Sequence, residues 1–149
     1  MKRWTAALMA LMLMALAAPA LAEAAELSGY YGQDIAQAAE ALGGLEWSRS
    51  DEYGDSYDSE KLSLRGDGTV RLIDLKAGDD YALCGVTVGM KRDDVLELMK
   101  DKNRMWDYDE EVAFTIEADK DDPAASRILV VFFDDNGKVS GAWYRATGK

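Results

Sequence analysis

The feature that most constrains the fold is an internal repeat with a spacing of 57 residues. The segment YYGQDIAQAAEAL, residues 30–42, aligns with TVGMKRDDVLELM, residues 87–99, when Gly32 is placed on Gly89. In both segments a glycine precedes apolar residues that are spaced as on one face of a short helix. Because such a face must be buried, we expect the two helices to pack on a common core.

The two predicted helices begin differently. In the first copy Asp34 and Gln37 have the spacing of a capping box, and a pair of glycines ends the helix. In the second copy Lys91 stands at the capping position, followed by two aspartates in the first turn. Lysine carries no acceptor for the free backbone amides, so we expect packing to hold this helix rather than local propensity.

Each helix is followed by a predicted hairpin, with the turn sequences RGDGTV and DDNGKV. We expect each hairpin to close over three residues, the last a left-handed glycine, because this register collects apolar side chains on one face. The first turn is then residues 66–68. The expected pairs are Leu64 with Val70 and Leu62 with Leu72 in the first copy, and Phe133 with Val139, Val131 with Gly141 and Leu129 with Trp143 in the second.

The second copy is longer between helix and hairpin, and VAFTIEA at residues 112–118 alternates as a half-buried strand does. The acidic segment 51–60 lacks the spacing of a calcium loop and is interpreted as a solvated loop. The sequence therefore predicts a helix and two strands in the first copy, then a linker, and a helix and three strands in the second copy. We expect an α+β fold in which both helices lie on one face of a continuous antiparallel sheet, with repeats at residues 23–76 and 77–149.

The Gly89-Met90 pair before a helix, the later tryptophan and VVFFDDNGKV resemble the tandem-repeat fold of the β-lactamase inhibitory proteins, shared by outer-membrane assembly lipoproteins of the SmpA/OmlA type. The resemblance covers nearly all of the chain after residue 22. It implies an exported protein without catalytic residues that binds other proteins. The inhibitors bind their partners through the sheet face that points away from the helices. The lipoproteins' anchoring cysteine is missing here, and no inhibitor contact residue is matched, so β-lactamase inhibition is not carried over.

The expected register also determines which side chains point away from the helices. In the first copy they are polar, and they include Lys61, Arg65 and Arg71. In the second copy they are Ile128, Val130, Phe132, Ala142 and Tyr144. An exposed Val, Ile or Phe forgoes roughly 1.5 to 3 kcal/mol of burial energy, so we expect this patch to be covered.

Two kinds of cover are compatible with the sequence. One is a protein or peptide partner, including a second copy of the chain as a homodimer, for which Lys61, Arg65 and Arg71 would add a basic patch suited to a carboxylate. The other is internal, through residues 23–31 or curvature of the sheet, with the basic residues only keeping the face soluble. Trp47 and Trp143 are predicted in the core, whereas Trp106 and Tyr108 are candidates for lining a groove.

No motif for chemistry is found. The chain contains no histidine, the commonest general base, and its glycines fall at helix starts and turns. Its single cysteine, Cys84, is interpreted as a small buried apolar residue. We expect neither enzymatic activity nor a cofactor nor a metal. A hydrolase that uses two of the many carboxylates is the alternative.

The first 22 residues are typical of a secretory signal, with a basic start, an apolar run and Ala20-Leu21-Ala22 before the expected cleavage site. The apolar run is shorter than a bilayer requires, so we expect an exported protein, periplasmic or extracellular, that does not span the membrane. Loss of Lys2 and Arg3 changes the net charge from −11 to −13. So acidic a surface disfavours nucleic acid and anionic lipid as partners.

Overall fold

Each copy of the repeat forms one short helix followed by four antiparallel strands, as seen in a computed structural model that describes residues 23–52 and 54–148. The expected signal peptide lies outside the described residues. The first copy comprises α1 (Ile35–Leu42), β2 (Glu46–Asp51), β3 (Gly54–Asp58), β4 (Leu62–Gly66) and β5 (Leu72–Leu75). The second comprises α2 (Arg92–Leu98), β7 (Asn103–Asp107), β8 (Glu111–Glu117), β9 (Arg127–Phe133) and β10 (Val139–Ala146).

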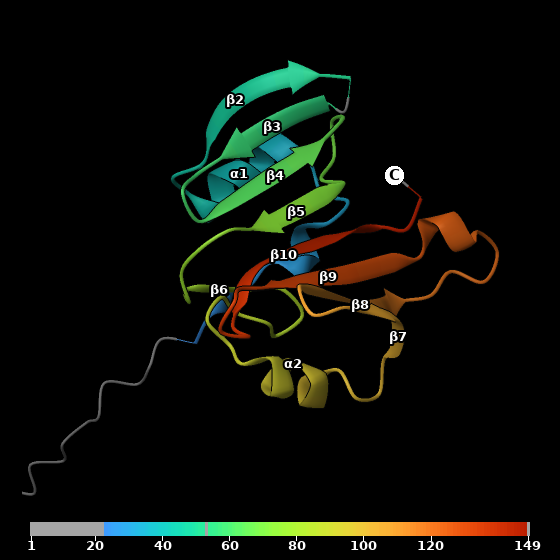
Figure 1. Cartoon of the computed structure of the whole chain (residues 1–149). Coiled ribbons are helices and arrows are strands. Elements are labelled where there is room, and N and C mark those ends of the chain that lie inside the picture. The colour runs from blue at the N-terminus through green and yellow to red at the C-terminus, as the bar shows by residue number, and fades with distance from the viewer. Residues whose placement is uncertain (1–22, 53, 149) are drawn as a thin grey trace, which may run out of the picture.

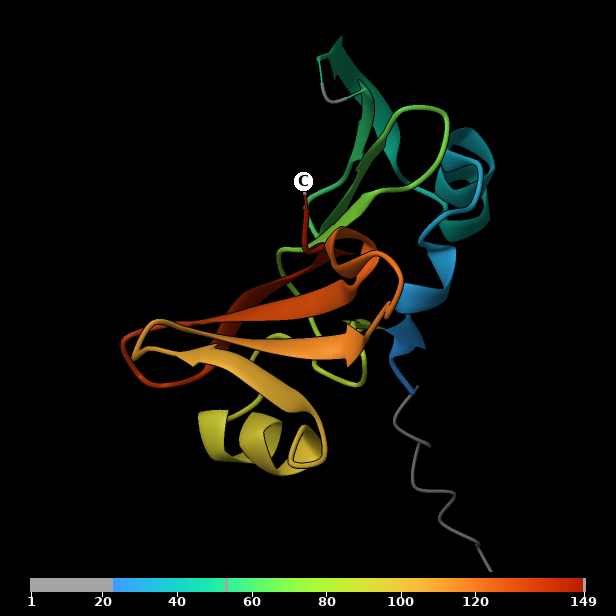
Figure 2. The ribbon, with the colours of Figure 1, turned by 90° about the vertical axis from the view of Figure 1, so that its right-hand side faces the viewer.

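The eight strands form one antiparallel sheet in the order β2-β3-β4-β5-β10-β9-β8-β7 (Figure 1). The last strands of the two repeats, β5 and β10, pair at its centre, so the second half repeats the order of the first in reverse. Figure 2 shows the two halves turned steeply against each other, as the twist of a long sheet requires. Buried residues of both helices join the same core cluster, which confirms the predicted α+β architecture.

Four short elements surround the sheet. Strand β1 (Ala25–Glu26) pairs in parallel with β6 (Tyr81–Ala82), and the 3-10 helices η1 (Ser28–Tyr30) and η2 (Pro123–Ala125) lie in the N-terminal segment and the β8–β9 loop. Leu27 is fully buried in the core on the helix side. Residues 23–31, one of the two internal covers considered, therefore pack on the helix side and not on the opposite face. Neither α-helix of the described chain is long and apolar enough to cross a bilayer.

The repeated glycine clamps each helix to the hairpin of its own copy. Gly32 and Gly89 have φ of +82° and +90°, a region that glycine enters without steric cost. The amide of Gly32 donates to the carbonyl of Val70 and that of Gly89 to the carbonyl of Val139, both at 2.8 Å. The Gly-helix motif thus fixes where the helix begins relative to the sheet.

The same clamp explains why the second helix tolerates a poor cap. Asp34 accepts a hydrogen bond from the amide of Gln37 at 2.9 Å, whereas Lys91 makes no side-chain cap. The first helical amide of α2, that of Arg92, instead donates to the carbonyl of Gly137 at 2.9 Å. A free amide of the helix is therefore satisfied by the turn of the hairpin, as required of any buried helix end.

The segment interpreted as an acidic loop is largely strand. Strands β2 and β3 occupy residues 46–51 and 54–58, and β3 is the counterpart of β8, so VAFTIEA does not account for the greater length of the second copy. The edge strands of both copies carry a register shift at matching places, around Ser48 and around Met105, again 57 residues apart. The length difference lies instead in the longer β8–β9 loop and β9. Few apolar residues occur in β3, which is why its sequence resembles a loop.

The first hairpin does not close over three residues. Leu64 pairs with Ile73 and Leu62 with Leu75, and residues 67–71 form a wider loop. The expected register is wrong because the loop pairs with the helix start: Thr69 bridges to Asp34, and the amide of Val70 donates to the carbonyl of Gln33 at 2.8 Å. We expected the backbone of residues 69 and 70 to belong to the hairpin, but it pairs with the start of the helix instead.

The second hairpin begins as expected and then shifts. Val139 pairs with Phe133, but a bulge between Val139 and Gly141 moves the remaining pairs by one residue, so Ala142 faces Val131 and Tyr144 faces Leu129. A shift of one residue exchanges the two faces of a strand. Ala142 and Tyr144 therefore lie in the core, and Trp143 points to the other side of the sheet.

Candidate functional site

The candidate site is the side of the sheet away from the helices, called the open face below. Of the five apolar residues expected there, Ile128, Val130 and Phe132 are present. Ala142 and Tyr144 are not, because the bulge turns them toward the helices, where Tyr144 is only 3% exposed. Ile128 and Val130 are themselves buried in a small second cluster with Ala113, against which Trp106 and Phe132 pack. The sheet thus covers much of its own apolar patch.

The accessible part of the apolar patch is an aromatic pair, Phe132 on β9 and Trp143 on β10. The ring centroids lie 4.9 Å apart at an interplanar angle of 72°, an edge-to-face contact. Trp143 is 39% exposed although it was predicted in the core. Gly141, an isolated glycine within the strand pattern, is the sequence signal for a bulge that would have placed it correctly.

A carboxylate holds the indole ring in place. The Nε1 atom of Trp143 donates to Oδ1 of Asp74 on β5, at 3.1 Å. Burial raises the pKa of Asp74, although Lys76 and the Trp143 hydrogen bond act in the opposite direction. The aromatic pair is therefore positioned by a bond across β5 and β10, the two strands that join the repeats.

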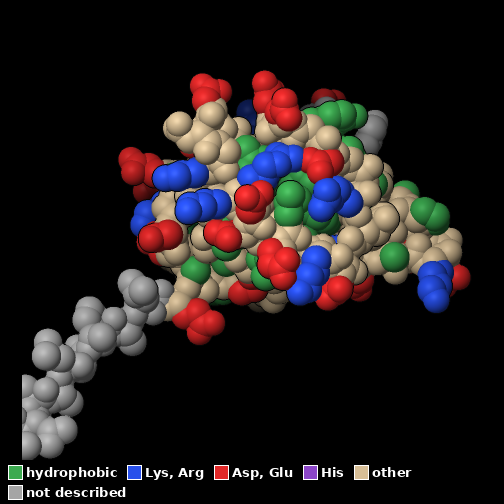
Figure 3. Space-filling model, turned by 60° about the horizontal axis from the view of Figure 1, so that its bottom comes forward, with side chains coloured by type: hydrophobic (Ala, Val, Ile, Leu, Met, Phe, Trp, Pro, Cys, Tyr) green, Lys and Arg blue, Asp and Glu red, His purple; other side chains and the backbone are tan. Residues whose placement is uncertain are grey.

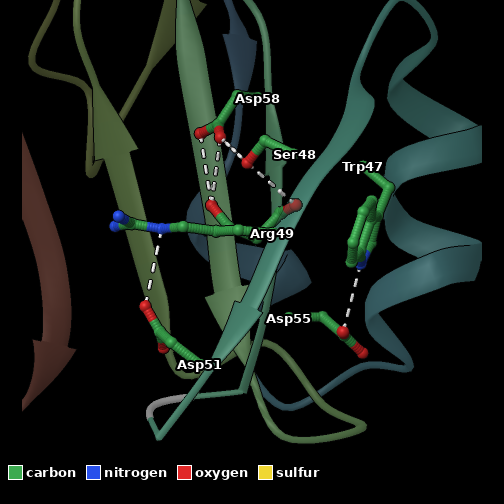
Figure 4. A network of polar contacts seen from close by, with 7 residues as sticks. Trp47, Ser48, Arg49, Asp51, Asp55 and Asp58 are labelled. Carbon is green, nitrogen blue, oxygen red and sulfur yellow. Dashed lines mark hydrogen bonds and ion pairs between the residues drawn. The ribbon is translucent and has the colours of Figure 1, made fainter.

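The first repeat continues the open face with a polar network around Asp58 (Figure 4). Ser48 donates to its carboxylate, as does Ser56 at 3.2 Å, and Ser63 adds a third hydrogen bond. Burial raises the pKa of Asp58, but these hydrogen bonds outweigh it and leave the pKa below its ordinary value. Ser56 and Ser63 are buried, so this half of the face is small and polar rather than apolar.

Trp47 lies on the opposite side of β2 from that network, toward α1, and donates to Asp55 at 3.2 Å (Figure 4). Trp47 was predicted in the core. It is not buried there, because β2 is an edge strand and Trp47 is 57% exposed.

The three basic residues expected beside the apolar patch are not gathered. Lys61 is paired with Asp80. Arg65 lies on the open face beside Ser56 and Leu72, with a buried Nε that has no hydrogen-bond partner in the described chain. Arg71 lies in the 67–71 loop and lines a cleft elsewhere. The amide of Arg71 still donates to the carbonyl of Arg65 at 2.7 Å, but its side chain lines that cleft.

The rim next to Phe132 is acidic instead. A shallow groove of about 650 Å³ is lined by Phe132, the exposed Tyr108 and the carboxylates of Asp109, Glu110 and Glu111. Tyr108 was predicted as a groove-lining candidate, whereas the acidic turn that brings it beside Phe132 depends on the β7–β8 pairing. The aromatic pair and this groove together form the accessible site.

The surface on the side of α2 is mixed in character. Seen from the side of α2, acidic and basic side chains are interspersed and hydrophobic ones form small separate areas (Figure 3). Within residues 23–52 and 54–148, no three His, Cys, Asp or Glu side chains are grouped so as to hold a metal ion.

Comparison with known proteins gives one structural likeness. No protein-family model and no curated protein matches the chain. An extracellular protein containing an SCP domain, from Bacillus anthracis str. Ames, matches with a TM-score of 0.54 at 12% sequence identity. The match covers 83% of this chain and 46% of that one, so this chain spans less than half of that protein. The likeness concerns the fold alone.

Proposed function

We propose that the chain is a non-catalytic exported module that binds another protein through the open face of its second repeat. The observation that carries this is the accessible Phe132–Trp143 pair, held in place by Asp74. Pre-positioned aromatic side chains are the residues that most often dominate binding energy at protein interfaces. Because these two rings are already ordered, little side-chain entropy is lost when a partner covers them.

The charge around the pair suggests the chemistry of the partner. The adjoining groove carries the carboxylates of Asp109, Glu110 and Glu111 beside Phe132 and Tyr108. A segment with an apolar side chain flanked by lysine or arginine complements it. The partner with a carboxylate, expected from Lys61, Arg65 and Arg71, is less well supported, because Lys61 is paired with Asp80 and the side chain of Arg71 lines another cleft.

Export is supported by two independent features. Residues 1–22 have the pattern of a cleaved secretory signal. The B. anthracis protein that shares the fold is described as extracellular. The sheet of this chain would then act outside the cytoplasm, in agreement with the resemblance to exported tandem-repeat binding proteins.

The experiment is a selection of peptides from a random display library on the immobilised protein. We expect enriched sequences with an aromatic or large aliphatic residue next to lysine or arginine. Binding of the enriched peptides should be lost in a Phe132→Ser/Trp143→Ser double variant and weakened in Glu110→Lys. Trp47→Ser is the matched control, since it removes an exposed tryptophan from the other side of the sheet. Peptides that bind the double variant as well as the parent would contradict the proposal.

The alternative is a structural homo-oligomer or envelope adaptor in which the same face meets a second copy. Static light scattering distinguishes it, because a Phe132/Trp143 dimer would dissociate in the double variant. Self-association through this face would bring two copies of the acidic rim together, which disfavours it.

A further inference from the structure

A second cleft lies at one end of the sheet, where the two repeats meet. It is about 630 Å³ in volume, within the range of small-ligand sites, and it is bordered by the 67–71 loop, the β8–β9 loop and the C-terminal residues 146–148. Three basic side chains line it, Arg71, Lys120 and Arg127, together with Tyr31 and three acidic residues. The open face plays no part in it.

The acidic residues of the cleft are engaged by the protein itself. Glu117 pairs with Arg127 at 3.3 Å. Asp119 accepts hydrogen bonds from the amides of Asp121 and Asp122 at 3.0 and 2.9 Å, and Asp122 accepts one from the amide of Ala124 at 3.1 Å. These contacts stabilise the β8–β9 loop and hold its carboxylates in place.

The basic residues are not all engaged. Arg127 is held by Glu117 and lies over the ring of Tyr31, 4.7 Å from its centroid. Arg71 and Lys120, by contrast, have no hydrogen bond or ion pair from their side chains within the described residues, and both are exposed. The cleft therefore presents two uncommitted cations next to carboxylates that are held by an ion pair or by backbone amides.

The remaining wall is made of small apolar groups. Ala118, Ala124, Ala125 and Ala146 line the cleft. Methyl groups of this size suit a small aliphatic side chain and not a large ring. The nearby carboxylates also disfavour a doubly charged phosphate relative to a singly charged group.

We propose that this cleft binds the carboxylate end of a peptide. The terminal carboxylate pairs with the guanidinium of Arg71, whose planar donors match it, and Lys120 adds a second positive charge. The last side chain of the peptide, small and apolar, lies against the alanines. This site is independent of the proposed binding of a protein through Phe132 and Trp143.

The test is a titration of the ¹⁵N-labelled protein with N-acetyl-trialanine, in parallel with its C-terminal amide. The amide resonances of Ala125 and Gly148 should shift and saturate with the free acid and stay unchanged with the amide. Arg71→Gln should weaken binding by about tenfold or more, since a charge-assisted hydrogen bond is lost. Lys138→Gln, which removes an exposed cation from the other hairpin turn, is the matched control and should leave the affinity unchanged.

Three outcomes would overturn the assignment. The amide could bind as well as the acid, Arg71→Gln could bind as the parent does, or inorganic phosphate could saturate the same resonances at lower concentration than the peptide. The Phe132→Ser/Trp143→Ser variant should retain cleft binding. The two proposals can therefore fail separately.

Discussion

Trp143 and Asp74 are joined by a hydrogen bond of 3.1 Å from the indole Nε1 to the carboxylate Oδ1, across the two strands that connect the repeats. Because consecutive residues of a strand face opposite sides, this contact also determines the place of Tyr144. Tyr144 packs edge-on against Tyr31 with ring centroids 5.7 Å apart, beneath the helices. One aromatic residue is thus available for binding and its neighbour is part of the core.

Replacement of these two neighbours should have different consequences. Tyr144→Ser should lower the free energy of unfolding by about 3 to 5 kcal/mol, the usual cost of deleting a buried aromatic ring. Trp143→Ser should cost about 1 kcal/mol, mainly through the lost hydrogen bond. Urea denaturation of both variants measures the difference. Equal losses would place Trp143 in the core and remove the accessible aromatic pair.

Asp74→Asn should flatten the dependence of stability on pH. Burial raises the pKa of Asp74, so its contribution to stability is fully present below the ordinary aspartate pKa and is lost as pH rises through the raised value. The asparagine is neutral throughout and keeps an acceptor for Trp143. Relative to the variant, the parent should therefore lose stability as the pH rises above the ordinary aspartate pKa of about 3.9. Urea midpoints measured below and above that pKa test this, with Asp67→Asn in the exposed loop as control.

Gly89→Ala should destabilise the second repeat by about 1 to 2 kcal/mol through backbone strain. An added Cβ would meet no atom within 4 Å, so the positive φ of +90° is the only source of the cost. Gly29→Ala has equal space and no positive φ, and it should be close to neutral. A thermal unfolding scan of both proteins separates the two cases. A neutral Gly89→Ala variant would show that the clamp does not need glycine.

Cys84 should react slowly with alkylating reagents in the folded protein. Burial and the nearby Glu26 carboxylate raise the pKa of its thiol to about 12, so little thiolate forms at neutral pH. We expect alkylation by iodoacetamide to be more than about tenfold slower in the native protein than in urea. Mass spectrometry over a time course measures both rates. Similar rates would mean that the thiol is accessible and ionises normally, contrary to its interpretation as a buried apolar residue.

Much of the fold could be predicted from particular residues. The 57-residue spacing of Gly32 and Gly89 located both helices, and the turn glycines located both hairpins. The alternation in VAFTIEA located β8. By contrast, the predicted two strands in the first copy and three in the second are wrong: β2, β3 and β7 were missed, because β2 and β7 are mostly exposed and β3 carries a single large apolar residue.

The candidate site was predicted in part. Ile128, Val130 and Phe132 lie on the open face as expected, since the strand pattern alone determines which residues alternate. Ala142 and Tyr144 were placed on the wrong side, and the basic patch does not exist as a unit. The errors for Ala142, Tyr144 and Arg71 follow from the register of their hairpins, since every later assignment on a strand depends on it.

The sequence by itself determined the repeat, the helix starts with their left-handed glycines, and the two-faced strand β9, because local spacing and backbone sterics are sufficient for these. Only the tertiary structure decided which aromatic residue of β10 faces outward and where Arg71 lies. The first depends on a bulge within the β9–β10 ladder. The second depends on hydrogen bonds between the loop and a helix start more than thirty positions earlier in the chain, a pairing that no local pattern specifies.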